Sequence, residues 1–64
     1  MPVINVDCGK ITKEQKEKLV EVLVSKASEI LNIPEEAFLT FIKESELDNI
    51  GKGTKLLSEI RKNQ

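Results

Sequence analysis

The feature that most constrains the fold is one long amphipathic segment set between two short strand-like segments. Thr12 followed three residues later by Gln15 is a capping-box signature, and it predicts a helix from about Lys13 to about Leu31. Apolar side chains recur through this segment at helical spacing: Leu19, Val20, Leu23, Val24, Ala27, Ile30 and Leu31. The opposite side carries charged residues, which we interpret as a solvated face: Lys13, Glu14, Lys16, Glu17, Lys18, Glu21, Lys26 and Glu29. The segment is therefore a helix with one side to bury.

Residues 2–8 and 38–44 have the alternating pattern of strands. In the first, one face is apolar and consists of Ile4, Val6 and Cys8. In the second, both faces carry apolar side chains, with Phe38, Thr40 and Ile42 on one face and Leu39, Phe41 and Lys43 on the other. Two strands joined by a long helix should be parallel, with a right-handed crossover.

The rest of the chain is predicted to be short turns and a small hairpin. Asn32 closes the helix, and residues 33–37 form a turn of helix with Pro34 at its first position. A polar loop over 45–49 leads to a hairpin tip at 51–54, an apolar patch at Leu56, Leu57 and Ile60, and a polar tail over 61–64. The predicted fold is α/β, a β-α-β unit with parallel strands plus a C-terminal β-hairpin, in one domain over residues 1–64.

A chain of 64 residues is too small to stabilise itself easily. A domain of about 60 residues buries only about 60% of the surface of its unfolded chain, and such chains usually need disulfides, a metal or partner subunits. One cysteine allows no internal disulfide, and without histidine a structural zinc site is not expected. We therefore expect a homo-oligomer.

Composition argues against several classes of partner. A net charge of −1 lacks the basic footprint of a nucleic-acid binder, and Phe38 and Phe41 are too few aromatics for base stacking. No apolar run approaches the roughly 20 residues of a membrane span, and the N-terminus does not have the pattern of a signal peptide. A lone cysteine fits a reducing compartment. We expect a cytoplasmic protein with no nucleic-acid or membrane partner.

Composition also removes most catalytic mechanisms. Without histidine there can be no Ser–His or Cys–His nucleophile pair. The Gly51-Lys52-Gly53-Thr54 fragment lacks the spacing of a phosphate-binding loop. Cys8 faces the apolar side of its strand, which favours a small core residue over a nucleophile. No cofactor and no metal are expected.

Pro2 is the candidate catalytic residue. Removal of the initiator Met1 would leave a secondary amine at Pro2, and a free α-amino group has a reference pKa of about 8. Packing against apolar side chains, or a nearby ammonium group, would favour the neutral amine, which suits a general base or acid. The alternative interpretation is that Pro2 simply begins a strand, a position that proline tolerates.

The whole chain resembles the 4-oxalocrotonate tautomerase family. The resemblance is carried by M-P-V-I-N-V at the start, T-K-E-Q-K-E-K-L-V at the helix opening, N-I-P-E-E-A-F after the helix, F-I-K-E in the second strand and N-I-G-K-G-T-K-L-L-S-E near the end. It implies a hexamer built as a trimer of dimers. It also implies that the nitrogen of Pro2 moves a proton between oxygen and carbon of a dienol, which yields an α,β-unsaturated ketone.

Other family positions differ in this chain. The family has an arginine in the loop after the first strand, and the nearest residue here is Lys10. With a one-residue gap in the alignment, the arginine falls on Ile11 instead. A second arginine aligns with Leu39, so its role is absent, and the family's phenylalanine before the glycine turn aligns with Ile50. Two interpretations of Lys43 stay open: it supplies charge in place of the missing arginine, or it is a solvated lysine at the end of the strand. The predicted substrate-binding residues are Lys10, Ile50 and Lys43.

Three functions remain open at this point. The first is a cofactor-independent keto–enol tautomerase, an isomerase that acts on a small dienol or 2-hydroxydienoate. The second is a non-catalytic oligomeric scaffold or binding protein that keeps the fold, which the loss of both arginines favours. The third is a relative that uses the same proline for hydrolytic dehalogenation or hydration, for which the sequence offers no positive feature.

Overall fold

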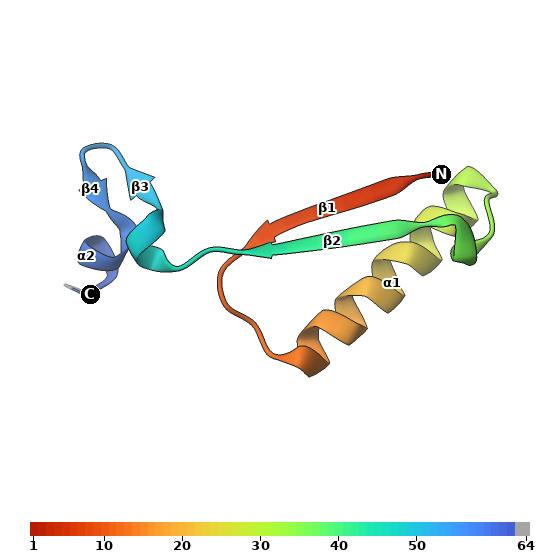
Figure 1. Cartoon of the computed structure of the whole chain (residues 1–64), viewed down its shortest axis with the longest axis horizontal. Coiled ribbons are helices and arrows are strands. Elements are labelled where there is room, and N and C mark those ends of the chain that lie inside the picture. The colour runs from red at the N-terminus through yellow and green to blue at the C-terminus, as the bar shows by residue number, and fades with distance from the viewer. Residues whose placement is uncertain (63–64) are drawn as a thin grey trace.

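The computed structural model describes residues 1–62. It consists of a β-α-β unit, residues 3–44, followed by a small C-terminal unit, residues 45–62 (Figure 1). The predicted α/β fold, with two parallel strands and a C-terminal antiparallel hairpin, is confirmed. The elements in chain order are β1 (Val3–Cys8), α1 (Lys13–Leu31), the 3₁₀ helix η1 (Glu35–Ala37), β2 (Leu39–Glu44), the 3₁₀ helix η2 (Leu47–Asn49), β3 (Gly51–Lys52), β4 (Lys55–Leu56) and α2 (Leu57–Lys62).

Helix α1 begins and ends where the sequence predicts. The Thr12 hydroxyl accepts a hydrogen bond from the Gln15 amide at 3.1 Å, and the Thr12 amide donates to Gln15 Oε1 at 2.9 Å. This reciprocal capping box satisfies two of the donors that a helix start leaves free. Asn32 has a left-handed conformation with φ of 58° and ends the helix. The local sequence therefore fixes both ends of the crossover.

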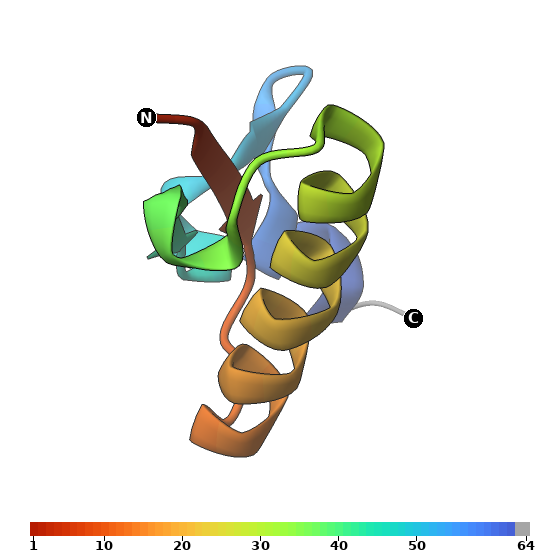
Figure 2. The same ribbon diagram turned by 90° about the vertical axis from the view of Figure 1, so that its right-hand side faces the viewer.

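Strands β1 and β2 pair in parallel, from Val3 opposite Leu39 to Cys8 opposite Glu44. Each begins one residue later than the alternating pattern suggests, and Pro34 caps η1 from outside it instead of being its first residue. Figures 1 and 2 show α1 along one side of the two strands and no element over the other side. The face toward α1 is half-buried and consists of Ile4, Val6, Cys8, Thr40, Ile42 and Glu44.

The opposite face of the sheet is open to solvent although it carries large apolar side chains. Phe41 is 55% exposed and Leu39 is 43% exposed, whereas among the side chains described Phe38 alone counts as buried. The apolar side of α1 is also only partly covered, because Ile30 and Leu31 at its end are exposed. The radius of gyration is 15.5 Å, whereas a compact domain of this length has one of about 11 Å. A single chain thus leaves much of its apolar surface uncovered.

The C-terminal unit contains more helix than the sequence indicates. The predicted polar loop over 45–49 includes η2, and the predicted tail begins inside α2, because Leu57 and Ile60 turn to one half-buried side of a short helix. Residues 63 and 64 of that tail lie outside the described residues. The hairpin tip is shorter than predicted, since Gly51 is paired in β3 and the turn consists of Gly53 and Thr54.

None of the helices within residues 1–62 has the length and apolar character needed to span a membrane.

Candidate active site

Pro2 lies immediately before β1 and is half-buried. Its carbonyl oxygen accepts a hydrogen bond from the Leu39 amide at 3.1 Å, which ties the residue to the start of β2. A proline at the first position of a strand costs no ladder hydrogen bond, because its missing N–H would point away from the partner strand or beyond it. Met1 before it is 85% exposed. The ring of Pro2 is therefore held in place while the residue that precedes it projects into solvent.

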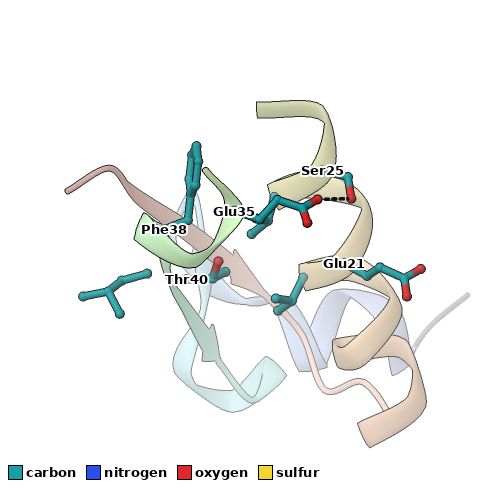
Figure 3. Close-up of a pocket in the computed structure, with 8 residues that line it drawn as sticks. Glu21, Ser25, Glu35, Phe38 and Thr40 are labelled. Carbon is teal, nitrogen blue, oxygen red and sulfur yellow. Dashed lines mark hydrogen bonds between the residues drawn. The ribbon is translucent and has the colours of Figure 1, made fainter. Parts of the chain in front are cut away.

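A groove of about 360 Å³ lies between α1 and the beginning of β2 (Figure 3). Its polar side chains include Glu21, Ser25 and Glu35, and the Ser25 hydroxyl donates a hydrogen bond to Glu35 Oε2 at 2.9 Å. The hydroxyl of Thr40 is buried and has no hydrogen-bond partner among the described residues. Pro2 does not line this groove. The groove is lined by carboxylates and by no ammonium group, so its charge disfavours an acidic substrate.

Lys10 lies in the loop between β1 and α1, beyond the opposite end of the sheet from Pro2. Its ammonium group is 3.3 Å from Glu46 Oε1, and the two side chains are 67% and 63% exposed. An exposed ion pair of this kind is worth little, about 0–1 kcal/mol. Lys10 therefore remains available to a competing carboxylate, provided that the carboxylate displaces Glu46.

Glu44 holds the same loop and is not among the site residues predicted from the sequence. Its Oε2 accepts a hydrogen bond from the Ile11 amide at 3.0 Å, and its Oε1 is 2.8 Å from the ammonium group of Lys16. The hydrogen bond from Lys16, followed by that from Ile11, lowers the pKa of Glu44 below its ordinary value. Lys16 was predicted to lie on the solvated face of α1, but it turns toward this carboxylate and is half-buried.

Strand parity could have identified Glu44. Residues 40, 42 and 44 share the face of β2 toward α1, so a carboxylate there must meet the helix. A charged group on a half-buried face normally has a partner. Lys16, near the start of α1, is the basic residue that could have been predicted as that partner.

The remaining two candidates lie apart from each other. Lys43 is exposed on the open face of the sheet, opposite Asp7 in the β1–β2 register. Ile50 is half-buried in the C-terminal unit, where its carbonyl accepts a hydrogen bond from the Leu57 amide at 2.7 Å and its amide donates to Leu47 at 3.3 Å. Ile50 is thus fixed by its own unit, and Lys43 by the sheet.

One chain does not bring these residues together with Pro2. Lys43 is opposite Asp7, five positions along β1 from Pro2, which at about 3.3 Å per residue is a separation of about 16 Å. Lys10 and Ile50 lie beyond that same far end (Figure 1). No group of three metal-binding side chains occurs within residues 1–62. The chain therefore presents an N-terminal proline at one end and cationic and apolar candidates at the other.

Comparison with known proteins identifies the family to which the chain belongs. The family model described as "Tautomerase enzyme" matches residues 2–60, a match that begins at Pro2 and includes most of the C-terminal unit. No curated protein sequence matches the chain. Several solved structures do.

Three of these structures illustrate the similarity. DmpI from Archaeoglobus fulgidus is 35% identical, covers 89% of this chain and 98% of its own, and superimposes with a TM-score of 0.80. YwhB, a homologue of 4-oxalocrotonate tautomerase, is 32% identical over 91% of this chain and 97% of its own, with a TM-score of 0.82. TomN, a 4-oxalocrotonate tautomerase homologue in the tomaymycin biosynthetic pathway, is 26% identical over 95% of both chains, with a TM-score of 0.88. The family model covers most of the chain and the solved structures share its fold, so the chain belongs to the tautomerase family.

Proposed function

We propose that the protein is a cofactor-independent keto–enol tautomerase in which the nitrogen of Pro2, freed by removal of Met1, transfers the proton. The observation that carries the proposal is the placement of Pro2, which is half-buried and bound through its carbonyl to Leu39, at the first position of a match to the tautomerase family. A partly desolvated amine favours its neutral form, because burial penalises the ammonium ion. Such an amine can act as a base near neutral pH.

The reaction is a proton transfer with no net change in the enzyme. The neutral Pro2 amine takes the proton from the hydroxyl of a dienol, and the resulting ammonium delivers a proton to a carbon at the end of the conjugated system. The O–H bond is broken and a C–H bond is formed, so the product is an α,β-unsaturated ketone. The amine returns to its neutral form, and no oxidant, reductant or cofactor takes part.

We propose further that subunits of a homo-oligomer complete the site, with a hexamer as the expected assembly. The chain exposes 5308 Å², whereas a compact monomer of 7.2 kDa exposes about 4,100 Å². The excess exceeds the roughly 800 Å² that each partner buries in a standard interface. The open sheet face with Leu39 and Phe41 is the surface that an adjacent subunit would cover. Such packing can also bring the far end of one chain to Pro2 of another.

Lys10 is the residue that we propose to bind a carboxylate of the substrate. It lies in a loop, it is largely exposed, and its present partner Glu46 is equally exposed. A lysine binds a carboxylate as a point charge, without the paired hydrogen bonds of an arginine. Ile50 would supply an apolar wall and Lys43 a second, weaker charge. This set suits a small dienol or a 2-hydroxydienoate better than a substrate with two carboxylates.

The test compares wild type with Pro2→Ala, with Pro34→Ala as the matched control. Mass spectrometry first establishes that Met1 is absent from all three proteins. We expect the Pro2→Ala rate on a simple dienol to fall by about 100-fold or more with the assembly intact, and the rate of Pro34→Ala to stay near wild type, because Pro34 is exposed and caps η1. Equal rates in all three would refute the proposal, and rates no higher than that of the uncatalysed reaction would favour the non-catalytic scaffold.

A further inference from the structure

The loop that carries Lys10 has an anchor from another element. Glu44, at the end of β2, uses both carboxylate oxygens: Oε2 accepts the Ile11 amide hydrogen at 3.0 Å, and Oε1 lies 2.8 Å from the Lys16 ammonium group. The Glu44 side chain is 24% exposed and that of Lys16 is 37% exposed. The contacts join three segments, since Glu44 belongs to β2, Lys16 to the second turn of α1 and Ile11 to the loop between β1 and α1.

Little else fixes the middle of this loop. A side chain added at Gly9 would meet nothing within 4 Å. Among the described residues Lys10 forms one ion pair, the exposed one with Glu46, and such pairs hold geometry weakly. Its charge also helps to lower the pKa of Glu44, without a direct contact to fix the loop. The neighbouring hydrogen bonds lie at the two ends of the loop, from the Ser45 amide to Cys8 and within the capping box of Thr12. The bond from Ile11 to Glu44 is therefore the contact that sets where the backbone next to Lys10 lies.

We propose that Glu44 is a positioning residue for substrate binding: it holds the β1–α1 loop so that Lys10 presents its ammonium group to the substrate's carboxylate. The inference rests on the proposed function, because it assigns Glu44 to the same site. A loop ordered before binding loses less freedom when the substrate arrives, so the interaction of Lys10 with a carboxylate is stronger. Glu44 itself touches no substrate, because both of its oxygens are occupied within the chain.

A purely structural role for Glu44 predicts a different pattern of effects. If Glu44 only joined β2 to α1, its loss would weaken the fold and reduce turnover of every substrate alike. A positioning role acts through Lys10, and it therefore affects only substrates that carry a carboxylate. The two roles are separated by assaying a 2-hydroxydienoate beside its methyl ester, which has the same enol and no charge.

The central variant is Glu44→Gln, which replaces the charged acceptor of the Ile11 amide by a weaker neutral one and loses the ion pair with Lys16 that orients it. Glu17→Gln is the control, because it makes the same change of charge at an exposed residue of α1 with no partner among the described residues. For Glu44→Gln we expect KM for the acid to rise about tenfold, corresponding to about 1.4 kcal/mol, with kcat for the acid and both constants for the ester unchanged. Glu17→Gln should match wild type on both substrates. An unchanged KM for the acid, or equal changes for acid and ester, would overturn the proposal.

Two further measurements keep the test decisive. If Glu44→Gln does not fold or assemble, Lys16→Met is assayed under the same criteria, because it removes the ion pair that orients the Glu44 carboxylate toward the Ile11 amide. It should raise KM for the acid about threefold and leave the ester alone, and no selective rise would overturn the proposal. In the wild type, the NMR shift of the Ile11 amide should follow the titration of Glu44, and an amide that ignores it would exclude the contact. Since this shift does not depend on turnover, failure of the Pro2→Ala test would be distinguishable from failure of the positioning role.

Discussion

The two units of the chain are held in opposite ways. The β-α-β unit is joined by contacts between residues far apart in sequence, including six register pairs between β1 and β2 and the bond from Ile11 to Glu44. The C-terminal unit, residues 45–62, is joined by local contacts: a hairpin of two-residue strands, and hydrogen bonds from Ile50 to Leu47 and from Leu57 to Ile50. In Figure 1 it extends beyond the end of the sheet.

This difference indicates what assembly must supply. The β-α-β unit has a defined shape but leaves the apolar face with Phe41 uncovered, whereas none of the side chains described in the C-terminal unit is buried. An isolated two-stranded hairpin is marginally stable in water. We therefore expect the first unit to need a partner for burial and the second to need one for order. The same packing would bring Ile50 of one chain toward Pro2 of another.

The largest effect is expected at the open face of the β-α-β unit. Phe41→Glu puts a carboxylate into the proposed interface, where an unpaired buried charge costs about 3–5 kcal/mol. Native mass spectrometry should show the oligomer lost, and activity should fall with it. Phe41→Leu is the control and should remain assembled, because it keeps an apolar side chain. A Phe41→Glu protein that assembles like wild type would show that this face is not the interface.

A smaller effect, confined to the C-terminal unit, is expected at the hairpin turn. Gly53 has φ of 63° and is the first residue of a two-residue turn, a conformation that glycine adopts without strain. Gly53→Ala should destabilise the hairpin by about 1–2 kcal/mol, seen as faster amide exchange in 45–62 and unchanged exchange in α1. Gly51→Ala is the matched control, because its added carbon would make only ordinary contact with the Lys55 carbonyl at 3.9 Å. Equal effects at both glycines would argue against local stabilisation of this unit.

The smallest effect is expected from the pH dependence of Glu44 in the β-α-β unit. Its pKa is lowered from the ordinary 4.5, through Lys16 first and then Ile11, with a smaller part from Lys10. The stabilisation is therefore complete above pH 4.5 and is lost as the pH falls through the lowered pKa, where Glu44 becomes protonated. In denaturant unfolding, wild type should exceed Glu44→Gln in stability near neutral pH and converge with it in acid. A gap that stays constant with pH would contradict this assignment.

The sequence predicted the elements well where local rules decide them. The capping box at Thr12 and the left-handed Asn32 gave both ends of α1, and the alternation of residues 2–8 and 38–44 gave the parallel pair. These features depend on neighbours a few residues away. The same rules placed Pro2 as the first residue of a strand, whereas β1 begins one residue later, at Val3.

The predictions failed where contacts between distant segments decide the outcome. From the sequence, Lys16 is predicted to be a solvated lysine on the charged face of α1. Only the packing of α1 on β2 turns its side chain toward Glu44. Ile30 belongs to the apolar stripe but is 72% exposed, because one chain has nothing to place against it. Helix α2 was missed because six residues give too short a period to separate a helix from a tail.

The most direct test of the account changes only Met1. The same sequence is prepared in two forms, one with Met1 removed and one with Met1 retained, and both are confirmed by mass spectrometry. In the retained form the nitrogen of Pro2 is an amide with no basic lone pair, while the fold and every other side chain are the same. Turnover of a simple dienol should occur with the processed form and be absent with the retained form. Equal turnover by both forms would contradict the claim that the Pro2 amine moves the proton.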